Sequence, residues 1–265
     1  MSVLKSTPNS AETIVHANGL GQSILPYGGL HTVLGALPAM LHPKPVEVAV
    51  IGLGSGGTVF GIGGRSETKS IDSIEIIAPE LETLRLLDQR RMYPALRMLL
   101  GDLRLQHWFT DGRMLIRKGS RRYDVIEADA LRPTSAYAGN LYSVEYFELL
   151  RDRLNPGGLA VTWTPTQRVV DTFVKVFPHV LVFEDMAIGT TIPLSLDRRA
   201  IADRMRQPFT RDYYRRGEID IEKLLAPYLL RDPRVYGPDF DRQALVDVNR
   251  DLFPKDEFAI DYRGR

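Results

Sequence analysis

The residues best suited to chemistry are a glycine loop and an acid that follows it along the chain. Gly52, Gly54 and Gly57 match the pattern G-x-G-x-x-G directly after the apolar run 48–51. Glycines let the backbone turn sharply and approach a ligand closely. Glu75 ends a second apolar run about 20 residues later, where a carboxylate is placed to bind the two hydroxyls of a ribose. This pairing predicts a ligand that contains a nucleoside.

The glycine loop and Glu75 each have another interpretation. A nucleoside-triphosphate loop is excluded because no Gly-Lys-Ser/Thr follows the glycines. A tight strand-to-helix turn without a ligand remains an alternative for the loop, and a solvated carboxylate remains one for Glu75. Gly61, Gly63 and Gly64 weaken the helix that follows, so we expect that helix to be short or irregular.

Two further acids follow later strands. Asp111, next to Gly112, comes after the run 105–110 and can accept a hydrogen bond from an exocyclic amine such as that of adenine. Asp129 follows the run 123–128 and can take a proton from an amine or hold a cationic substrate. Either aspartate can instead serve as a turn or helix-cap residue. Three acids at three strand ends favour a single crevice at one edge of a sheet.

Strand-like and helix-like segments alternate from residue 46 onward. The predicted strands are 46–51, 70–75, 105–110, 123–128 and 159–163, and the predicted helices are 79–91, 143–153 and 171–177. This alternation predicts an α/β fold with a mainly parallel sheet and helices on both faces. Before it, the segment 12–25 with Asn18-Gly19 at its centre predicts a β-hairpin, and residues 31–41 predict a short helix.

Composition divides the chain into three parts. Residues 1–45 form the hairpin and helix region, 46–195 the nucleoside-binding catalytic domain, and 196–265 a C-terminal extension. The extension has too few large apolar residues to build its own core, so we expect it to pack on the sheet domain. Within it, 219–230 is predicted to be helical and 232–239 to be a loop.

The bulk composition excludes several classes of protein. The 265 residues carry a net charge of +1 and no long basic block, which argues against nucleic-acid and membrane-surface binding. The chain has no cysteine and its five histidines are scattered, so we expect no metal site. No apolar run approaches the roughly 18 residues of a membrane helix, and the first residues lack the layout of a secretory signal. A cytoplasmic protein is expected.

The chain resembles the spermidine synthase (polyamine aminopropyltransferase) family, and in particular its bacterial spermidine-synthase-like branch, along nearly its whole length. The matching segments are Gln22, 34–38, His42-Pro43, 48–58, Ile74-Glu75, Asp111-Gly112-Arg113, 123–129, 140–147, 154–163, 177–179 and 249–258. The resemblance implies the class I S-adenosylmethionine-methyltransferase-like Rossmann fold, with a seven-stranded sheet behind the N-terminal β-hairpin region, usually in a homodimer. It implies transfer of an aminopropyl group from decarboxylated S-adenosylmethionine, the co-substrate, to an amine such as putrescine.

The resemblance also implies roles for individual residues. The expected donor-binding residues are Gln22, Gly52, Gly54, Ser55, Gly56, Glu75, Asp111 and Gly112. Among them, Glu75 would bind the ribose and Asp111 the adenine amine. Asp129 would help deprotonate the attacking amine, which displaces methylthioadenosine. On the substrate side we expect Arg132, Leu141 and Tyr142, the last two in the loop that covers the site.

Three places depart from the family pattern, and one of them is Leu30-His31-Thr32, which stands where family synthases have Tyr-His-Glu. Ser55 stands where family synthases have an acid in the glycine loop, and Arg132 stands where they have the second acid of an Asp-x-x-Asp-Pro box. Both changes weaken the attraction for cationic substrates, whereas an arginine can pair with a carboxylate such as that of ordinary S-adenosylmethionine. An S-adenosylmethionine-dependent methyltransferase is therefore one alternative. A non-catalytic nucleoside-binding relative is a second, and a nicotinamide-dependent dehydrogenase is a third.

Overall fold

A small antiparallel sheet precedes the main body of the molecule. The computed structural model describes residues 2–6, 12–17, 20–128, 132, 133, 135 and 137–258. The first strands are β1 (Ser2–Ser6), β2 (Thr13–Ala17) and β3 (Leu20–Leu25), which pair in the order β1-β2-β3. The predicted N-terminal hairpin is confirmed as β2 and β3, and β1 adds a third strand to it.

The main sheet has eight strands in the part of the chain that the structure describes. They are β4 (Glu47–Ile51), β5 (Ser70–Glu75), β6 (Leu105–Phe109), β7 (Tyr123–Ala128), β8 (Leu154–Trp163), β9 (His179–Val182), β10 (Met186–Thr190) and β11 (Arg234–Tyr236). Their order is β11-β9-β10-β8-β7-β4-β5-β6. The five strands from β8 to β6 are parallel, whereas β10, β9 and β11 pair antiparallel. The predicted mainly parallel sheet is confirmed.

Three predictions about the strands need correction. The sheet has one strand more than the resemblance implied, because part of the segment 232–239, predicted as a loop, pairs with β9 as β11. The strand predicted at 159–163 begins earlier, because β8 starts at Leu154, with a shift in register against β7. The antiparallel strands β9 and β10 were not predicted from the sequence.

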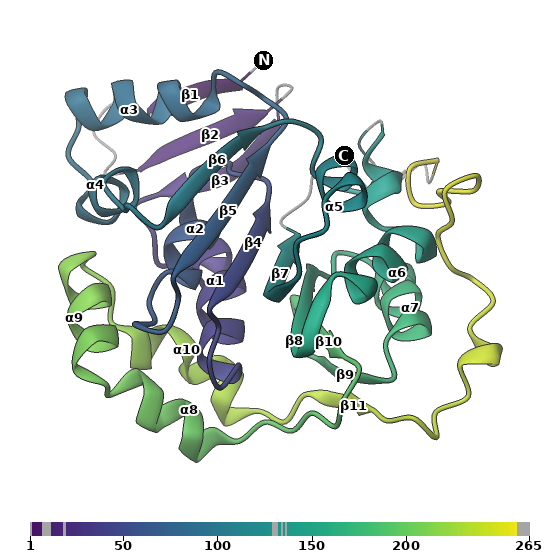
Figure 1. Ribbon diagram of the computed structural model, residues 1–265. Coiled ribbons are helices and arrows are strands. Elements are labelled where there is room, and N and C mark those ends of the chain that lie inside the picture. The colour runs from purple at the N-terminus through teal and green to yellow at the C-terminus, as the bar shows by residue number, and fades with distance from the viewer. Residues whose placement is uncertain are drawn as a thin grey trace.

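Helices cover both faces of the main sheet (Figure 1). They are α1 (Leu30–Leu41), α2 (Gly57–Ile62), α3 (Glu80–Arg90), α4 (Pro94–Leu100), α5 (Gly112–Lys118), α6 (Val144–Asp152), α7 (Gln167–Val176), α8 (Arg198–Met205), α9 (Pro208–Arg216) and α10 (Ile221–Leu230), with the 3-10 turns η1 (Ala138–Leu141) and η2 (Arg242–Ala244). In Figure 1, α1 and α2 lie on one face and α6 and α7 on the other. The short helix expected after the glycine loop is confirmed as α2.

Side chains of the central strands alternate between two buried clusters. Val48 and Val50 of β4 belong to the cluster on the α1 and α2 side, whereas Ala49 and Ile51 belong to the one on the α6 and α7 side. Successive strand residues point to opposite faces, so a sheet covered on both faces buries every residue of its central strands. This is why β4 appears in the sequence as a continuous apolar run after Glu47.

Among the described helices, α5, α6, α7, α8 and α10 begin directly after a residue whose side chain caps them. Asp111 precedes α5, Ser143 precedes α6 and Thr166 precedes α7, and each side-chain oxygen accepts a hydrogen bond from the backbone N–H three residues further on. The Thr166 cap starts α7 earlier than the predicted start at residue 171. The Asp111 cap starts α5, a helix that the sequence pattern did not predict.

The C-terminal part of the chain packs on both sides of the main sheet. α8 and α10 contact α1. Tyr213 and Tyr214 of α9 donate hydrogen bonds to the α2 carbonyls of Phe60 (3.0 Å) and Gly61 (2.5 Å). After η2 the chain passes outside α7 and α6 and returns to the neighbourhood of α5 (Figure 1). None of the helices in the described part of the chain is long and apolar enough to cross a membrane.

Candidate functional site

A cavity of about 860 Å³ opens at the carboxyl edge of the parallel strands. Its walls come from the ends of β4, β5 and β8, the residues that follow β6, the N-terminal sheet, the start of α1, Arg132 and the turn 137–141. Ligands of open α/β sheets bind at this edge, and ligand sites occupy about 300–1,000 Å³. Both its place and its size suit a small-molecule ligand.

The glycine loop forms the part of the cavity that follows β4. Gly52, Gly54 and Gly56 have φ angles of 103°, 50° and 87°, in the left-handed region that favours glycine. The turn brings the backbone of Gly52 and Gly54 to the cavity surface without side chains in between. A ligand can therefore approach the main chain directly.

Glu75 joins the end of β5 to this loop. Its Oε2 accepts a hydrogen bond from the backbone N–H of Leu53 (2.8 Å), and its Oε1 accepts one from that of Ile77 (2.7 Å). The side chain lines the cavity although Glu75 is only 8% exposed. Each carboxylate oxygen can accept a second hydrogen bond, so Glu75 holds the loop and still offers acceptors to hydroxyl groups.

Asp111 follows β6, which is two strands away from β4 in the sheet. Its Oδ1 accepts a hydrogen bond from the backbone N–H of Met114 (2.8 Å) and caps α5. The helix-cap interpretation is thus confirmed, and Asp111 and Gly112 also line the cavity. One oxygen of the carboxylate caps the helix while the other is available to an amine of a ligand.

Gln22 supplies a buried polar atom that needs a partner. Its side-chain Nε2 is buried, and nothing in the described part of the chain accepts a hydrogen bond from it. Its backbone carbonyl accepts one from Nε2 of His31 (2.7 Å). Leaving a buried donor unpaired costs about 1–3 kcal/mol. Because Gln22 lines the cavity, a ligand oxygen or nitrogen there would satisfy this donor.

Most of the residues predicted for the site meet at this cavity. Those that line it are Gln22, Gly52, Gly54, Glu75, Asp111, Gly112, Arg132 and Leu141. Asp129 lies outside the described residues, directly after the end of β7 at Ala128. The cavity therefore brings together both the predicted donor side and part of the predicted substrate side.

Three predicted residues lie beside the cavity rather than on its surface. Ser55 is buried behind the glycine loop, where its N–H donates to Oγ of Ser23 (2.8 Å) and its carbonyl accepts from the hydroxyl of Tyr27 (2.5 Å). Gly56 precedes α2 and faces the same hydroxyl. Tyr142 is fully buried in the cluster on the α6 side. These residues support the walls from behind.

The cavity also contains residues that the sequence analysis did not include as site residues. The Arg113 guanidinium pairs with both carboxylate oxygens of Asp251, at 2.7 and 2.5 Å, and the Ser143 hydroxyl also donates to Asp251. Asp251 lies in the acid-rich segment 249–258, but no pattern connects that segment with Arg113. Arg117 lines the cavity as well.

Three arginines line the cavity, and among the described residues only Arg113 has an ion-pair partner. Burial alone would raise the pKa of Asp251, but hydrogen bonds from Arg113 and Ser143, with the charge of Arg113, hold that pKa below its ordinary value. Asp251 is therefore ionised at neutral pH and neutralises Arg113. Arg117 and Arg132 form no ion pair with the described residues, and both line the cavity. The charge of Arg117 also lowers the pKa of Asp251, whereas Arg132 is exposed at the cavity surface.

The same region contains a buried acid and a buried tyrosine. Glu127 of β7 is fully buried, and burial together with the Glu127 charge raises the pKa of the Tyr146 hydroxyl. The Arg113 guanidinium lies over the Tyr146 ring at 5.8 Å. Among the described residues, no group of three or more His, Asp or Glu side chains is arranged to hold a metal ion.

Comparisons with known proteins agree with this geometry. The family model described as "Spermine/spermidine synthase domain" matches residues 29–176, more than half of the chain. A polyamine aminopropyltransferase from Thermotoga neapolitana is 30% identical over 130 residues, which are 49% of this chain and 42% of that protein. One from Caldicellulosiruptor saccharolyticus is 24% identical over 220 residues, which are 80% and 72% of the two chains. The match thus spans less than half the length of the Thermotoga relative.

The fold also resembles solved structures. A spermidine synthase in complex with the transition-state analogue AdoDATO superposes with a TM-score of 0.60 at 20% identity, over 76% of this chain and 80% of that one. A likeness at this identity concerns the fold. It supports the predicted α/β fold with a mainly parallel sheet and a small N-terminal antiparallel sheet.

Proposed function

The chain belongs to the spermine/spermidine synthase family, and we propose that it transfers the aminopropyl group of decarboxylated S-adenosylmethionine to a small amine. The observation that carries this proposal is the convergence of Gln22, the glycine loop, Glu75 and Asp111 on one cavity. An adenosyl sulfonium compound presents ribose hydroxyls, an adenine amine and a charged chain. The cavity offers acceptors for the first two groups and one unpaired buried donor.

We assign the donor to the side formed by the loop and the ends of β5 and β6. Glu75 accepts hydrogen bonds from the ribose hydroxyls with the acceptor capacity that its two backbone partners leave free. Asp111 accepts one from the adenine amine, and the Gln22 amide donates to the ligand. Ser55 and Gly56 keep the loop in place from behind. The proposal uses no metal.

The chemistry of the transfer is a nucleophilic displacement. The lone pair of the amine nitrogen forms a bond to the aminopropyl carbon next to the sulfonium, while the bond between that carbon and sulfur breaks. The bonding electrons neutralise the sulfur, methylthioadenosine leaves, and the amine nitrogen loses one proton. We propose that Asp129 takes this proton, because it follows β7 immediately in sequence. Arg132 and Leu141 would border the acceptor.

A second candidate function rests on the two unpaired arginines. Arg117 and Arg132 face the same cavity without ion-pair partners among the described residues. Ordinary S-adenosylmethionine carries a carboxylate that a guanidinium can bind, whereas its decarboxylated form does not. Methyl transfer from S-adenosylmethionine on the same fold is therefore the alternative.

Calorimetric titration with the two sulfonium compounds distinguishes these proposals. Tighter binding of decarboxylated S-adenosylmethionine would support aminopropyl transfer, and tighter binding of the intact compound would support methyl transfer. If neither compound binds, both proposals fail. Methylthioadenosine serves as a neutral control that lacks the charged chain and reports on the nucleoside contacts alone.

We also propose that the protein is cytoplasmic and forms a homodimer, as the family resemblance implies. Light scattering on the purified chain would test the dimer. A mass equal to one chain across the micromolar range would contradict it.

A further inference from the structure

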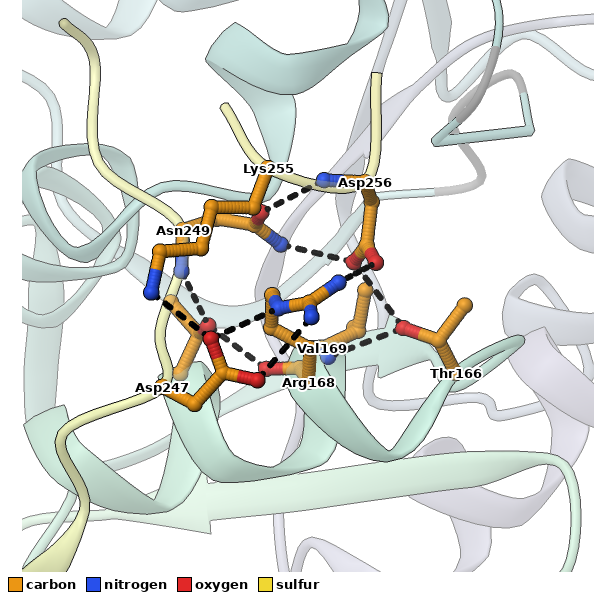
Figure 2. A network of polar contacts seen from close by, with 8 residues as sticks. Thr166, Arg168, Val169, Asp247, Asn249, Lys255 and Asp256 are labelled. Carbon is orange, nitrogen blue, oxygen red and sulfur yellow. Dashed lines mark hydrogen bonds and ion pairs between the residues drawn. The ribbon is translucent and has the colours of Figure 1, made fainter. Parts of the chain in front are cut away.

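The last described segment of the chain, residues 247–258, forms a strap from the outer face of α7 to the cavity. Figure 2 shows its anchor, where Arg168 of α7 lies between Asp247 and Asp256. The Arg168 guanidinium pairs with Asp247 at 2.9 Å and with Asp256 at 2.5 Å. Hydrogen bonds from Arg168 and Lys255 hold the pKa of Asp247 at about 2, so this anchor is ionised at neutral pH.

Buried hydrogen bonds join the beginning of the strap to its end. The Asn249 side chain donates to Asp256 Oδ2 (2.8 Å) and accepts from the Asp256 backbone N–H (3.1 Å). The Thr166 hydroxyl, at the start of α7, donates to the same Asp256 oxygen (3.0 Å). Asn249 and Asp256 are almost completely buried. The segment therefore has a defined conformation on α7.

One loop of the strap reaches the cavity wall through Asp251. The bidentate pair with Arg113 is fixed further by the Ser143 hydroxyl. Arg113 Nη1 also donates to the carbonyl of Asn140 in η1 (2.8 Å). Asp251 thus orients the Arg113 guanidinium, and this guanidinium holds η1 through the Asn140 carbonyl.

The end of the strap holds the same turn through Glu257. Its Oε1 accepts a hydrogen bond from the backbone N–H of Tyr137 (2.8 Å), and its Oε2 accepts one from that of Gly139 (3.1 Å). Tyr137 lines the cavity and has a φ of 67°, a left-handed conformation that is strained for a residue with a side chain. The Glu257 carboxylate holds Tyr137 in this conformation.

The turn and the strap are also in direct contact. A Cβ added at Gly139 would lie 2.2 Å from Cβ of Pro254 and 2.8 Å from Oε2 of Glu257. Real Cβ atoms do not approach so closely, so any side chain at 139 would separate the two segments. The close approach makes glycine necessary here.

We propose that Asp251 and Glu257 are positioning residues of the cavity, through which the C-terminal strap fixes Arg113 and the turn 137–141 before a ligand binds. Fixing a wall in advance removes the loss of conformational entropy that ordering it on binding would require. The proposal uses the proposed function only to choose the ligand for its test. The geometry of the strap itself is independent of that choice.

Amide hydrogen exchange of residues 137–142 tests the proposal without a ligand. Asp251→Asn, Glu257→Gln and Gly139→Ala each remove or displace one contact between strap and turn. Glu184→Gln is the matched control, because the exposed Glu184 pairs with Arg231 away from the cavity. We expect exchange in the turn to accelerate about 10-fold in the first three variants, because each weakens the contacts that hold the turn closed, and to stay unchanged in the control.

Affinity for methylthioadenosine gives the functional readout. We expect dissociation constants to rise about 5- to 20-fold in Asp251→Asn and Glu257→Gln, with melting temperatures close to that of the wild type. Unchanged exchange and affinity in both variants would overturn the proposal, as would equal changes in Glu184→Gln. If the wild type does not bind methylthioadenosine, the proposed function fails, and the exchange rates alone decide the role of the strap. If one variant fails to fold, the remaining two carry the test.

Discussion

The backbone N–H of Leu53 donates a 2.8 Å hydrogen bond to Oε2 of Glu75, which joins the glycine loop after β4 to the end of β5. The other carboxylate oxygen accepts from the backbone N–H of Ile77. One acid therefore shapes the loop, fixes the chain beyond β5 and lines the cavity. In this site the group proposed to bind the ribose is also the group that holds the loop in place.

Replacing Glu75 should weaken ligand binding more than it weakens the fold. In Glu75→Gln the amide NH₂ faces one of the two backbone N–H donors, so one hydrogen bond is lost and a ribose acceptor disappears. Because hydrogen bonds to charged groups contribute about 1.5–3 kcal/mol, we expect the dissociation constant for methylthioadenosine to rise about 10- to 100-fold. Titration calorimetry measures this. Glu47→Gln, at the amino end of β4, is the control and should bind normally; equal affinity of both variants would contradict the assigned role.

The conformation of the glycine loop should not tolerate a side chain at residue 56. Gly56 has a φ of 87°, and an added Cβ would lie 2.3 Å from Leu99 Cδ2 and 2.7 Å from the Tyr27 hydroxyl. Backbone strain and overpacking together should lower the free energy of unfolding of Gly56→Ala by about 2–4 kcal/mol. Urea denaturation would show this. Gly237→Ala, whose Cβ would meet nothing within 4 Å, should be nearly neutral; an equal loss in both variants would count against a requirement specific to the loop.

Buried His42 and half-buried His107 should make stability depend on pH. Burial lowers the pKa of His42 in spite of the opposite effect of the Asp124 charge, and the charges of Arg65 and Arg204 act in the same direction as burial. Burial also lowers the pKa of His107. A histidine whose pKa is lower in the folded state binds fewer protons than in the unfolded state. Its stabilisation is therefore complete above the ordinary value of about 6.5 and is lost as the pH falls below that value.

Denaturation curves at pH 7.5 and 5.5 measure this effect. The free energy of unfolding should fall on acidification, and His42→Asn should reduce the fall, because asparagine can still accept the hydrogen bond from the Lys44 backbone but has no charge to gain. A wild-type stability that does not change between these pH values would show that neither histidine titrates differently on folding.

The arginines of the cavity should affect the two sulfonium compounds differently. Arg132→Gln removes a positive charge that faces the cavity, so binding of S-adenosylmethionine should weaken and binding of its decarboxylated form should strengthen or stay the same. Competition calorimetry with both compounds gives the ratio of affinities. Arg211→Gln, on the exposed side of α9, is the control. An unchanged ratio in Arg132→Gln would show that this guanidinium does not select between them.

The core of the fold was predictable because burial on both faces leaves a direct trace in the sequence. The runs at 70–75 and 123–128 correspond to β5 and β7. β11 was not predicted because it has only three residues and little of its surface is buried. It lies at the edge of the sheet and pairs with β9. The helix α5 escaped because its seven residues are too few to show a periodic apolar stripe.

The candidate site was predictable where chemistry depends on a strand end. The glycine loop, Glu75 and Asp111 follow strands whose parallel order brings their ends to one edge. The contact between Arg113 and Asp251 joins residues 138 positions apart, and no local pattern encodes such a pairing. The burial of Ser55 behind its loop likewise depends on contacts with Ser23 and Tyr27, which belong to other elements.

Formation of methylthioadenosine tests the proposed function most directly. The purified chain would be incubated with decarboxylated S-adenosylmethionine and a panel of diamines and polyamines, and the products analysed by mass spectrometry. We predict methylthioadenosine together with an amine enlarged by one aminopropyl group, with both products much reduced in Asp129→Asn. No methylthioadenosine with any amine, or S-adenosylhomocysteine formed from intact S-adenosylmethionine instead, would contradict aminopropyl transfer.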